Sequence, residues 1–243
     1  MQIIAKSILL TLQRFVRYNL IMNDLQLFLD SFWKILIPGL TITIPLTVIS
    51  FSLAIVIGTI TALIQFANVK VLKQIAKIYI WIIRGTPLLV QLLLIFYGLP
   101  SVGIVLDPFP AAIIVFSLNE GAYTAETIRG ALESINVGQI EAGYCVGMNF
   151  IQIMWHIILP QAFKNAFPSL ANSLISMVKD SSLASNITVI EMLMKTKQLV
   201  SVYYEPLLLY SEAGIIYLLF STVLSKIART IENRLKSKVV HHD

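Results

Sequence analysis

Between Lys34 and Lys70 the chain contains no Asp, Glu, Lys or Arg, and this uncharged run limits the possible folds more than any other feature. A transmembrane helix needs about 20 predominantly apolar residues to cross a hydrocarbon core of about 30 Å. Across the whole chain, 57% of the residues are hydrophobic and 13% are charged, about half the charged fraction of a soluble domain. Together with a mean hydropathy of +0.80, this composition predicts an all-α membrane protein.

The distribution of charges along the chain predicts five transmembrane helices. The first lies between Lys34 and Lys70, and we expect Pro38 and Pro45 to kink it. The other four are predicted at residues 78–106, 111–125, 163–190 and 206–225. No internal repeat or linker divides the chain, so we expect one transmembrane domain over residues 31–230, followed by a basic tail over residues 231–243.

The basic residues predict the orientation in the membrane, because lysine and arginine are more frequent in cytoplasmic loops. In the five-helix topology, Lys70, Lys73, Lys77 and Arg129 share a side with the basic tail, whereas the loop 98–110 has no basic residue. The C-terminus is therefore predicted to be cytoplasmic and the N-terminus outside. The basic residues that disagree, because they would lie outside, are Lys6, Arg14, Arg17, Lys34, Lys195 and Lys197.

Residues 1–30 are interpreted as an interfacial amphipathic segment. The apolar stretch before Arg14 is too short to cross a bilayer. Arg14 and Arg17 also stand where a signal peptide would have small residues. A disordered or partly processed leader is the alternative.

Composition also excludes several kinds of chemistry. The net charge is +5, but the basic residues lie beside apolar runs and in the tail, so lipid headgroups are expected as partners and nucleic acid is not. Cys145 is the single cysteine, and with three scattered histidines it gives no metal-site spacing. We find no set of nucleophile, base and orienting group, so the chain is not expected to be an enzyme, and no cofactor is expected in it.

The predicted cytoplasmic loop 130–161 is expected to form a short helical hairpin. Gly143 and Gly147 are four residues apart, a spacing that would let another surface approach one helix face, although loop flexibility is an alternative. The predicted apolar face of the following helix consists of Phe150, Ile151, Met154, Ile157 and Ile158, with Gln152 and His156 elsewhere. Pro160 is expected to break the helix, so that the chain turns there toward the fourth span.

Glu141, Ala142, Gly147 and the segment "IILP" that ends at Pro160 resemble the EAA loop of binding-protein-dependent ABC importer permeases. The resemblance extends to "RGTPLLVQLLLIFYGLP", "LNEGAYTAETIRG" and "KDSSLAS", which are similar to the polar amino-acid branch of histidine, glutamine, arginine and cystine type. Matching segments cover most of residues 32–230. Gly143 replaces the usual second alanine, a change that we expect to be tolerated, and Asn136 replaces a usual proline, which would loosen the entry to the hairpin.

The resemblance implies a type I (MetI-like) permease in the bacterial cytoplasmic membrane. Such a permease pairs with a second copy or a paralogue, receives its substrate from an extracytoplasmic binding protein, and alternates between inward- and outward-facing states. The chain has no phosphate-binding loop, so ATP and Mg²⁺ would be bound and ATP hydrolysed by a partner dimer of ABC ATPase subunits. The residues expected to couple to that ATPase are Glu141, Ala142, Gly143, Gly147, Ile157, Leu159 and Pro160.

Ionisable residues at membrane depth are costly and are therefore candidates for function. The candidates for the substrate path are Asn119, Glu120, Lys179, Asp180, Ser181 and Ser182. Glu120 suggests a substrate with a cationic group, such as a cationic amino acid, cystine or glutamine; a structural ion pair is the alternative for Glu120 and for the Lys179–Asp180 pair. Arg84 and Glu126 are expected to form a structural pair or a gate.

The predicted function is an ATP-driven importer subunit for polar amino acids. A passive channel and an intramembrane enzyme are the rival hypotheses. Neither explains the EAA spacing.

Overall fold

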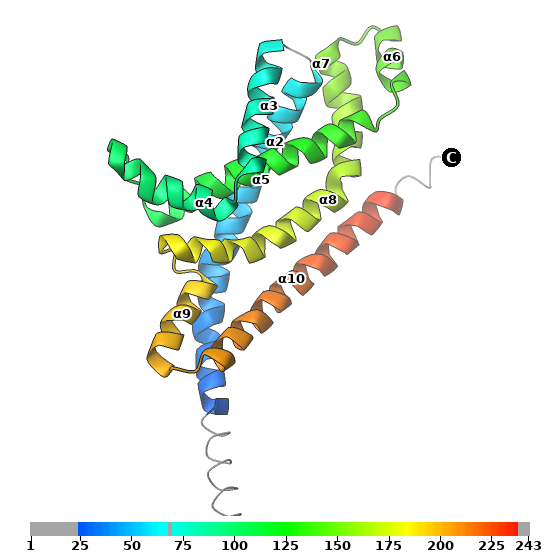
Figure 1. Cartoon of the computed structure of the whole chain (residues 1–243). Helices are drawn as coiled ribbons and strands as arrows, with labels where there is room; N and C mark the ends of the chain where they lie inside the picture. Colours follow the sequence, from blue (N-terminus) through cyan, green and yellow to red (C-terminus); the bar gives the residue numbers. More distant parts are fainter. Residues whose placement is uncertain (1–23, 68–69, 238–243) are drawn as a thin grey trace, which may run out of the picture.

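The computed structural model describes residues 24–67 and 70–237, and the regular elements in these ranges are all helices, joined by short loops, with no strand (Figure 1). Most of the predicted interfacial segment 1–30, and the end of the basic tail, lie outside the described residues. The first helix runs over Asp24–Phe66 and includes a π-helical turn at Gly39–Thr43 followed by α2, Ile44–Phe66. The structure thus confirms a helix over the uncharged run.

The second predicted span is not one straight helix. It consists of α3, Lys70–Gly85, and α4, Leu88–Leu93, which continues through a π-helical turn at Leu94–Gly98 and a 3₁₀ turn at Leu99–Val102. The two parts are bent by 103°. Pro87 explains the break, because it has no backbone N–H and disfavours helical geometry at Thr86; its own backbone is extended.

The third span corresponds to α5, Pro108–Glu133, which extends beyond the prediction at both ends. A loop leads from α5 to α6, Gly138–Cys145, and a second loop leads to α7, Phe150–Ile153. A π-helical turn at Met154–Ile158 then joins α7 to α8, Leu159–Asp180.

The prediction that the fourth span continues to Ile190 was wrong. After α8 the chain forms a 3₁₀ helix, Ser181–Ile187, and Thr188 then has a positive φ of 62°. A short helix that was not predicted, α9, Met192–Tyr203, begins at Glu191, whose carboxylate accepts hydrogen bonds from the backbone N–H groups of Leu193 and Met194. These bonds satisfy donors that the first turn of any helix leaves free, so Glu191 fixes a new helix start.

The last helix, α10, extends over Pro206–Ser237, twelve residues beyond the predicted end at Ser225. Among the described residues, two helices are long and apolar enough to cross a membrane by themselves: Asp24–Phe66 and the helix that begins at Pro206. The bent pair of α3 and α4 is a third candidate if it is counted as one span.

Each of the three π-helical turns ends two residues before a proline, at Pro45, Pro100 and Pro160. A proline lacks the N–H donor, and its ring collides with the carbonyl group of the preceding turn. Widening that turn relieves the collision, so the helix can continue. The expectation that the chain turns at Pro160 was therefore wrong, because the helical backbone runs from Phe150 to Asp180 without interruption.

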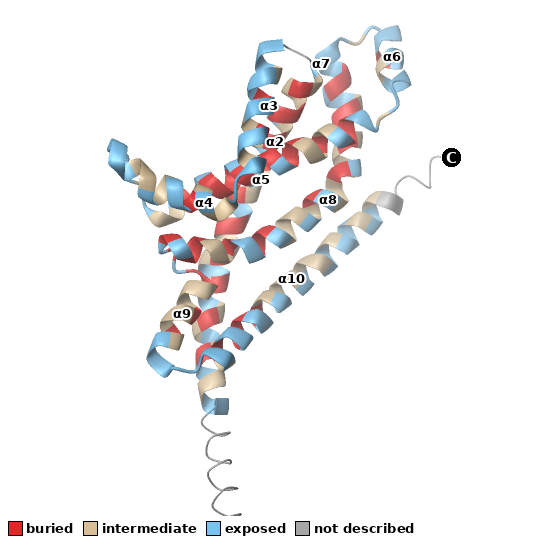
Figure 2. Cartoon of the chain, viewed as in Figure 1, coloured by how far each residue is buried: buried red, intermediate tan, exposed pale blue. Residues whose placement is uncertain are grey.

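The long helices α2 and α5 pack tightly at the centre of the molecule (Figure 1). A Cβ on Gly58 would lie 2.5 Å from Cγ2 of Thr124, so this crossing requires glycine. Buried residues concentrate on α2 and α5 and on one side of α8, whereas most of α10 is exposed or half-buried (Figure 2). The α6–α7 segment, the start of α3 and the C-terminal end of α10 lie toward one end of the molecule, and the start of the first helix and α9 lie toward the other (Figure 1).

Candidate functional sites

A cavity of about 560 Å³ opens between α5 and α8, and we call it the polar cavity. Three of the residues predicted to line the substrate path border it, Asn119, Glu120 and Asp180. The other lining residues are Leu88, Tyr123, Ser169, Asn172, Ser173, Ser176 and Leu183. The cavity wall therefore carries two carboxylates and no cationic side chain.

Glu120 is the most unusual group of the polar cavity. Its Oε1 atom is buried and has no hydrogen-bond partner in the described chain. A buried polar atom without a partner is costly, so its presence beside a cavity suggests that a ligand completes it. Asn119, by contrast, donates its side-chain amide to Oε1 of Gln91 at 3.0 Å.

The other predicted path residues lie outside the cavity wall. Lys179 is exposed and does not line the cavity. Consecutive residues of a helix, such as Lys179 and Asp180, lie about 100° apart, so one can line the cavity without the other. The Ser181 side chain is buried and donates to the carbonyl oxygen of Val178, and Ser182 is half-buried. The structure thus brings together only part of the predicted set.

Sequence reasoning missed the polar face of α8. Ser169, Asn172, Ser173, Ser176 and Asp180 follow one another at helical spacing, which places them on one face toward α5. That period of three to four residues was visible in the sequence. It would have predicted the second wall of the cavity.

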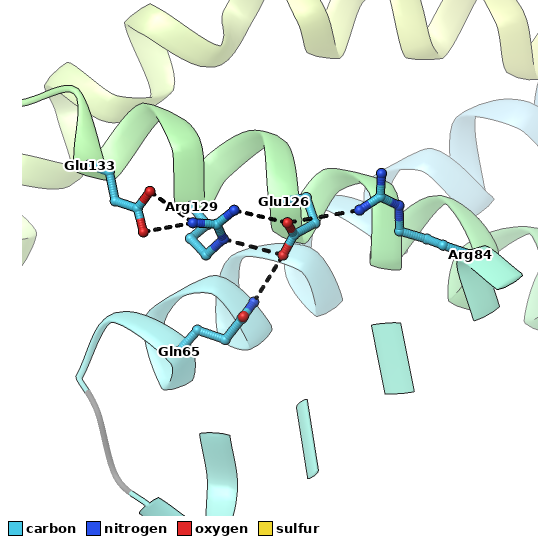
Figure 3. A network of polar contacts seen from close by, with 5 residues as sticks. All are labelled: Gln65, Arg84, Glu126, Arg129 and Glu133. Carbon is cyan, nitrogen blue, oxygen red and sulfur yellow. Dashed lines mark hydrogen bonds and ion pairs between the residues drawn. The ribbon is translucent and has the colours of Figure 1, made fainter. Parts of the chain in front are cut away.

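A network of charged side chains lies further along α5 (Figure 3). Arg129 donates to Glu126 from Nη2 at 3.0 Å and to both carboxylate oxygens of Glu133 at 2.7 and 2.8 Å. Arg84 of α3 approaches Glu126 at 3.8 Å, and Gln65 of α2 donates to the same carboxylate at 3.4 Å. The network therefore ties α2 and α3 to α5.

Arg84 also connects this network to the polar cavity. The centre of its guanidinium group lies 5.1 Å from the ring centroid of Tyr123, which borders the cavity. A cation over an aromatic face is attracted by the ring quadrupole. Arg84 is consequently held on two sides, by Tyr123 and by Glu126.

Residues 138–158, which comprise α6, α7 and the π-helical turn after α7, form a compact helical hairpin. The N-terminus of α7 has a capping box: Asn149 accepts from the Gln152 backbone N–H, and the Gln152 side chain accepts from the Asn149 N–H, both at 2.9 Å. At the end of α6, the Met148 N–H bonds to the Gly143 carbonyl oxygen and the Gly147 N–H to that of Tyr144. With φ of +80° at Gly147, this is a Schellman motif.

The two hairpin glycines do not form the expected helix face. Gly147 lies beyond the end of α6 at Cys145 and closes that helix. Gly143 is buried, but the surface against it is Ile153 of the same hairpin: a Cβ at Gly143 would lie 2.7 Å from Ile153 Cγ1. The close approach is therefore internal to the hairpin.

The apolar face of the hairpin also differs from the prediction. Ile153, Met154 and Ile158 are buried, whereas Ile151 is 76% exposed. Among the residues predicted to couple to the ATPase, Glu141, Ala142, Gly147 and Pro160 are exposed, Ile157 is half-buried, and Gly143 and Leu159 are buried. Trp155, one turn after Ile151, is 70% exposed, so both side chains form an apolar patch at the surface.

Comparison with known proteins identifies the class of protein that this fold belongs to. The chain belongs to the family of binding-protein-dependent transport system inner membrane components, whose profile matches residues 54–237. The expected resemblance to amino-acid ABC importer permeases is thereby confirmed. The chain is a subunit of a membrane transport system, and the channel and enzyme hypotheses are not favoured.

Individual relatives show which kinds of transport permease the chain is similar to. The chain is 45% identical to the L-cystine transport system permease protein TcyB of Bacillus subtilis over 207 residues, which cover 85% of this chain and 88% of TcyB. It is 36% identical to the nopaline permease NocM of Agrobacterium fabrum, over 86% of this chain and 90% of NocM. The arginine permease ArtQ of Bacillus subtilis is 34% identical, over 83% of this chain and 93% of ArtQ.

Solved structures agree with the fold. A crystal structure of an amino acid ABC transporter with histidines matches with a TM-score of 0.78 and 34% identity, over 85% of this chain and 96% of the other. The inward-facing methionine transporter MetNI matches with a TM-score of 0.71 over 83% of this chain and 96% of the other. At 19% identity, MetNI supports the MetI-like fold alone.

Proposed function

We propose that the chain forms the translocation path of an ATP-driven importer for polar amino acids that carry two cationic groups, with L-cystine as the first candidate. The observation that carries this proposal is the polar cavity, in which Glu120 and Asp180 face the same space and no lining residue is cationic. L-cystine has two ammonium groups, and arginine has an ammonium and a guanidinium group. Glutamine has one cationic group and fits the two carboxylates less well. The name of the relative TcyB points in the same direction.

The proposal includes five membrane crossings: the first helix, the bent pair of α3 and α4, α5, α8 and α10. In this arrangement the first half of α3, which carries Lys70, Lys73 and Lys77, lies toward the same end as the hairpin and the end of α10. That end is taken as cytoplasmic, because lysine and arginine mark the cytoplasmic side. The N-terminus then lies outside and the C-terminus inside.

The hairpin is proposed to dock in the partner ATPase, which binds ATP with Mg²⁺ and hydrolyses it. The exposed Ile151 and Trp155 side chains offer apolar area for this contact. Glu141 lies in the first turn of α6, is exposed, and has no side-chain partner in the described chain, so it can bind a basic residue of the ATPase. A second permease and an extracytoplasmic binding protein complete the proposed complex.

The test is uptake by the complete transporter. The permease is purified in mild detergent with its co-purifying subunits, reconstituted into vesicles that contain ATP, and supplied with labelled L-cystine, L-arginine or L-glutamine. We expect ATP-dependent uptake of L-cystine, and a loss of at least tenfold in uptake at low substrate for Glu120→Gln. The matched control is Glu205→Gln, at an exposed glutamate outside the cavity, which should transport normally.

Three results would oppose the proposal. Uptake without ATP would indicate a channel, and recovery of the permease without an ATPase would remove the coupling role of the hairpin. Equal uptake of L-cystine by wild type and Glu120→Gln would show that the Glu120 carboxylate does not contribute to substrate binding.

A further inference from the structure

A second, smaller cavity of about 260 Å³ lies between α8 and the C-terminal half of α10, and we call it the arginine cavity. Its charged lining residues are Arg229 and Glu232, and its polar ones are Asn172 and Ser225; Pro168, Ala171, Ile175 and Ala228 complete the wall. The two helices run alongside each other there (Figure 1). The cavity is separate from the charge network on α5.

Asn172 connects the two cavities, because its side chain borders both of them. It lies on the polar face of α8 beside Ser173 and Ser176, and the residues of the arginine cavity occupy the adjacent face of the same helix. A molecule that passes Asn172 therefore moves from a wall with two carboxylates to a wall that contains a cation. The α8 residues of the arginine cavity, within 168–175, lie on average nearer the start of α8, which adjoins the hairpin, than those of the polar cavity, within 169–180.

Arg229 has no hydrogen bond or ion pair with any other residue of the described chain. The other charged residue of the cavity, Glu232, is already engaged in an interaction. A guanidinium group offers five donors in a planar fork that matches a carboxylate. Arg229 is therefore the group of the arginine cavity that can bind an anion.

The chemistry of the substrate fits this order of sites. An amino acid carries an α-carboxylate as well as an α-ammonium group, and the polar cavity provides carboxylates for the ammonium but no cation for the carboxylate. A second position with a free arginine supplies the missing partner. The arginine cavity can thus receive the substrate after it leaves Glu120.

We propose that the arginine cavity is a second substrate site on the way to the cytoplasm, in which Arg229 binds the α-carboxylate of the transported amino acid. This inference rests on the proposed function above. Because the site acts after first binding, its loss should slow the release step and leave the initial affinity almost unchanged.

The test compares steady-state uptake by reconstituted transporters that carry Arg229→Gln, Arg229→Lys or Lys226→Gln, with the amount of ATPase subunit that co-purifies as the measure of assembly. We expect Arg229→Gln to lower kcat for L-cystine uptake about fivefold to tenfold with KM within about twofold of wild type, since charge-assisted hydrogen bonds are lost. Arg229→Lys keeps the charge and should restore at least half of the wild-type kcat. Lys226 is exposed on α10 outside the cavity wall, so Lys226→Gln should match wild type.

The outcomes separate this inference from the proposed function. If wild type shows no ATP-driven uptake, the proposed function fails; if wild type transports and Arg229→Gln has a kcat within twofold of it, only the second site fails. An equal loss in Lys226→Gln would attribute the effect to general charge and overturn the site as well. Should Arg229→Gln not assemble, Ser225→Leu fills the same cavity while keeping Arg229, and unchanged uptake by that variant would refute the proposal.

Discussion

Gln91 of α4, just after the break that follows α3, and Asn119 of α5 are joined by a side-chain hydrogen bond of 3.0 Å. The amide nitrogen of Gln91 donates at the same time to the carbonyl oxygens of Ile83 and Thr86, at 2.8 and 3.1 Å. One side chain thus satisfies carbonyl groups at the end of α3 and ties the bend to the wall of the polar cavity. These bonds hold the 103° break between α3 and α4 in this structure.

Replacement of Gln91 should destabilise this bend. Gln91→Leu removes the donor for two carbonyl oxygens and leaves Asn119 without its acceptor, so we expect a loss of about 1–3 kcal/mol in the free energy of unfolding. The measurement is thermal unfolding of the purified complex. Gln139→Leu, at an exposed position of α6, is the control and should melt as wild type does. Unchanged unfolding of Gln91→Leu would mean that the bend does not depend on this side chain.

Gly143→Ala should loosen the hairpin. Its Cβ would lie 2.7 Å from Cγ1 and 2.9 Å from Cδ1 of the buried Ile153, so the isoleucine has to move. We expect this packing cost to exceed the gain of up to about 1 kcal/mol that alanine brings in helix propensity, and less ATPase to co-purify. In Gly214→Ala, a Cβ meets nothing within 4 Å, so this control should be neutral or stabilising.

A second substitution tests the same contact from the other side. The double variant Gly143→Ala with Ile153→Ala removes the colliding atoms, so its loss of co-purifying ATPase should be smaller than the sum of the losses in Gly143→Ala and Ile153→Ala alone. If the double variant were no better than the sum of the two single ones, the contact with Ile153 would not be the cause.

At position 147, the loss of glycine should destabilise the hairpin, whereas the size of the new side chain should matter little. A Cβ there meets nothing within 4 Å, whereas φ of +80° is strained for any residue with a side chain. We expect Gly147→Ala and Gly147→Trp to destabilise the hairpin similarly, by about 1–2 kcal/mol, and Gly147→Asn to be milder. Recovery of the ATPase in pull-downs ranks the three variants. A normal Gly147→Ala with a defective Gly147→Trp would instead favour a docking partner against this position.

The long helices could be predicted because runs without charge leave few alternatives, as the helix over Asp24–Phe66 shows. Their ends were harder to predict. Pro87 breaks the helix inside an uncharged stretch. The buried Glu191 starts α9 by accepting bonds from the backbone N–H groups of Leu193 and Met194, although a charge at that position predicts the end of a span. In both places local backbone chemistry outweighs hydrophobicity.

The sites were predictable in part for a similar reason. Glu120 and Asp180 stand out as charges among apolar residues, but the polar face of α8 consists largely of serine, which is common enough in membrane helices to escape notice. The spacing of Gly143 and Gly147 fits both a helix face and a helix with a terminating glycine. The positive φ of Gly147 in the structure distinguishes the two.

The charge network of α5 yields the last prediction, because its two arginines contribute unequally. Arg129 makes hydrogen bonds of 2.7 to 3.3 Å with Glu126 and Glu133, whereas Arg84 approaches Glu126 only at 3.8 Å. Arg129→Gln should therefore lower the free energy of unfolding by about 1–2 kcal/mol, and Arg84→Gln by less than half of that. Arg129→Lys keeps the charge but not the planar fork, so it should fall between wild type and Arg129→Gln. Thermal unfolding at low and high salt measures this order, and equal losses in the two glutamine variants would contradict it. Because both arginines reach the same carboxylate, the double variant should lose more than the sum of the single losses if Arg84 moves closer to Glu126 when Arg129 is absent.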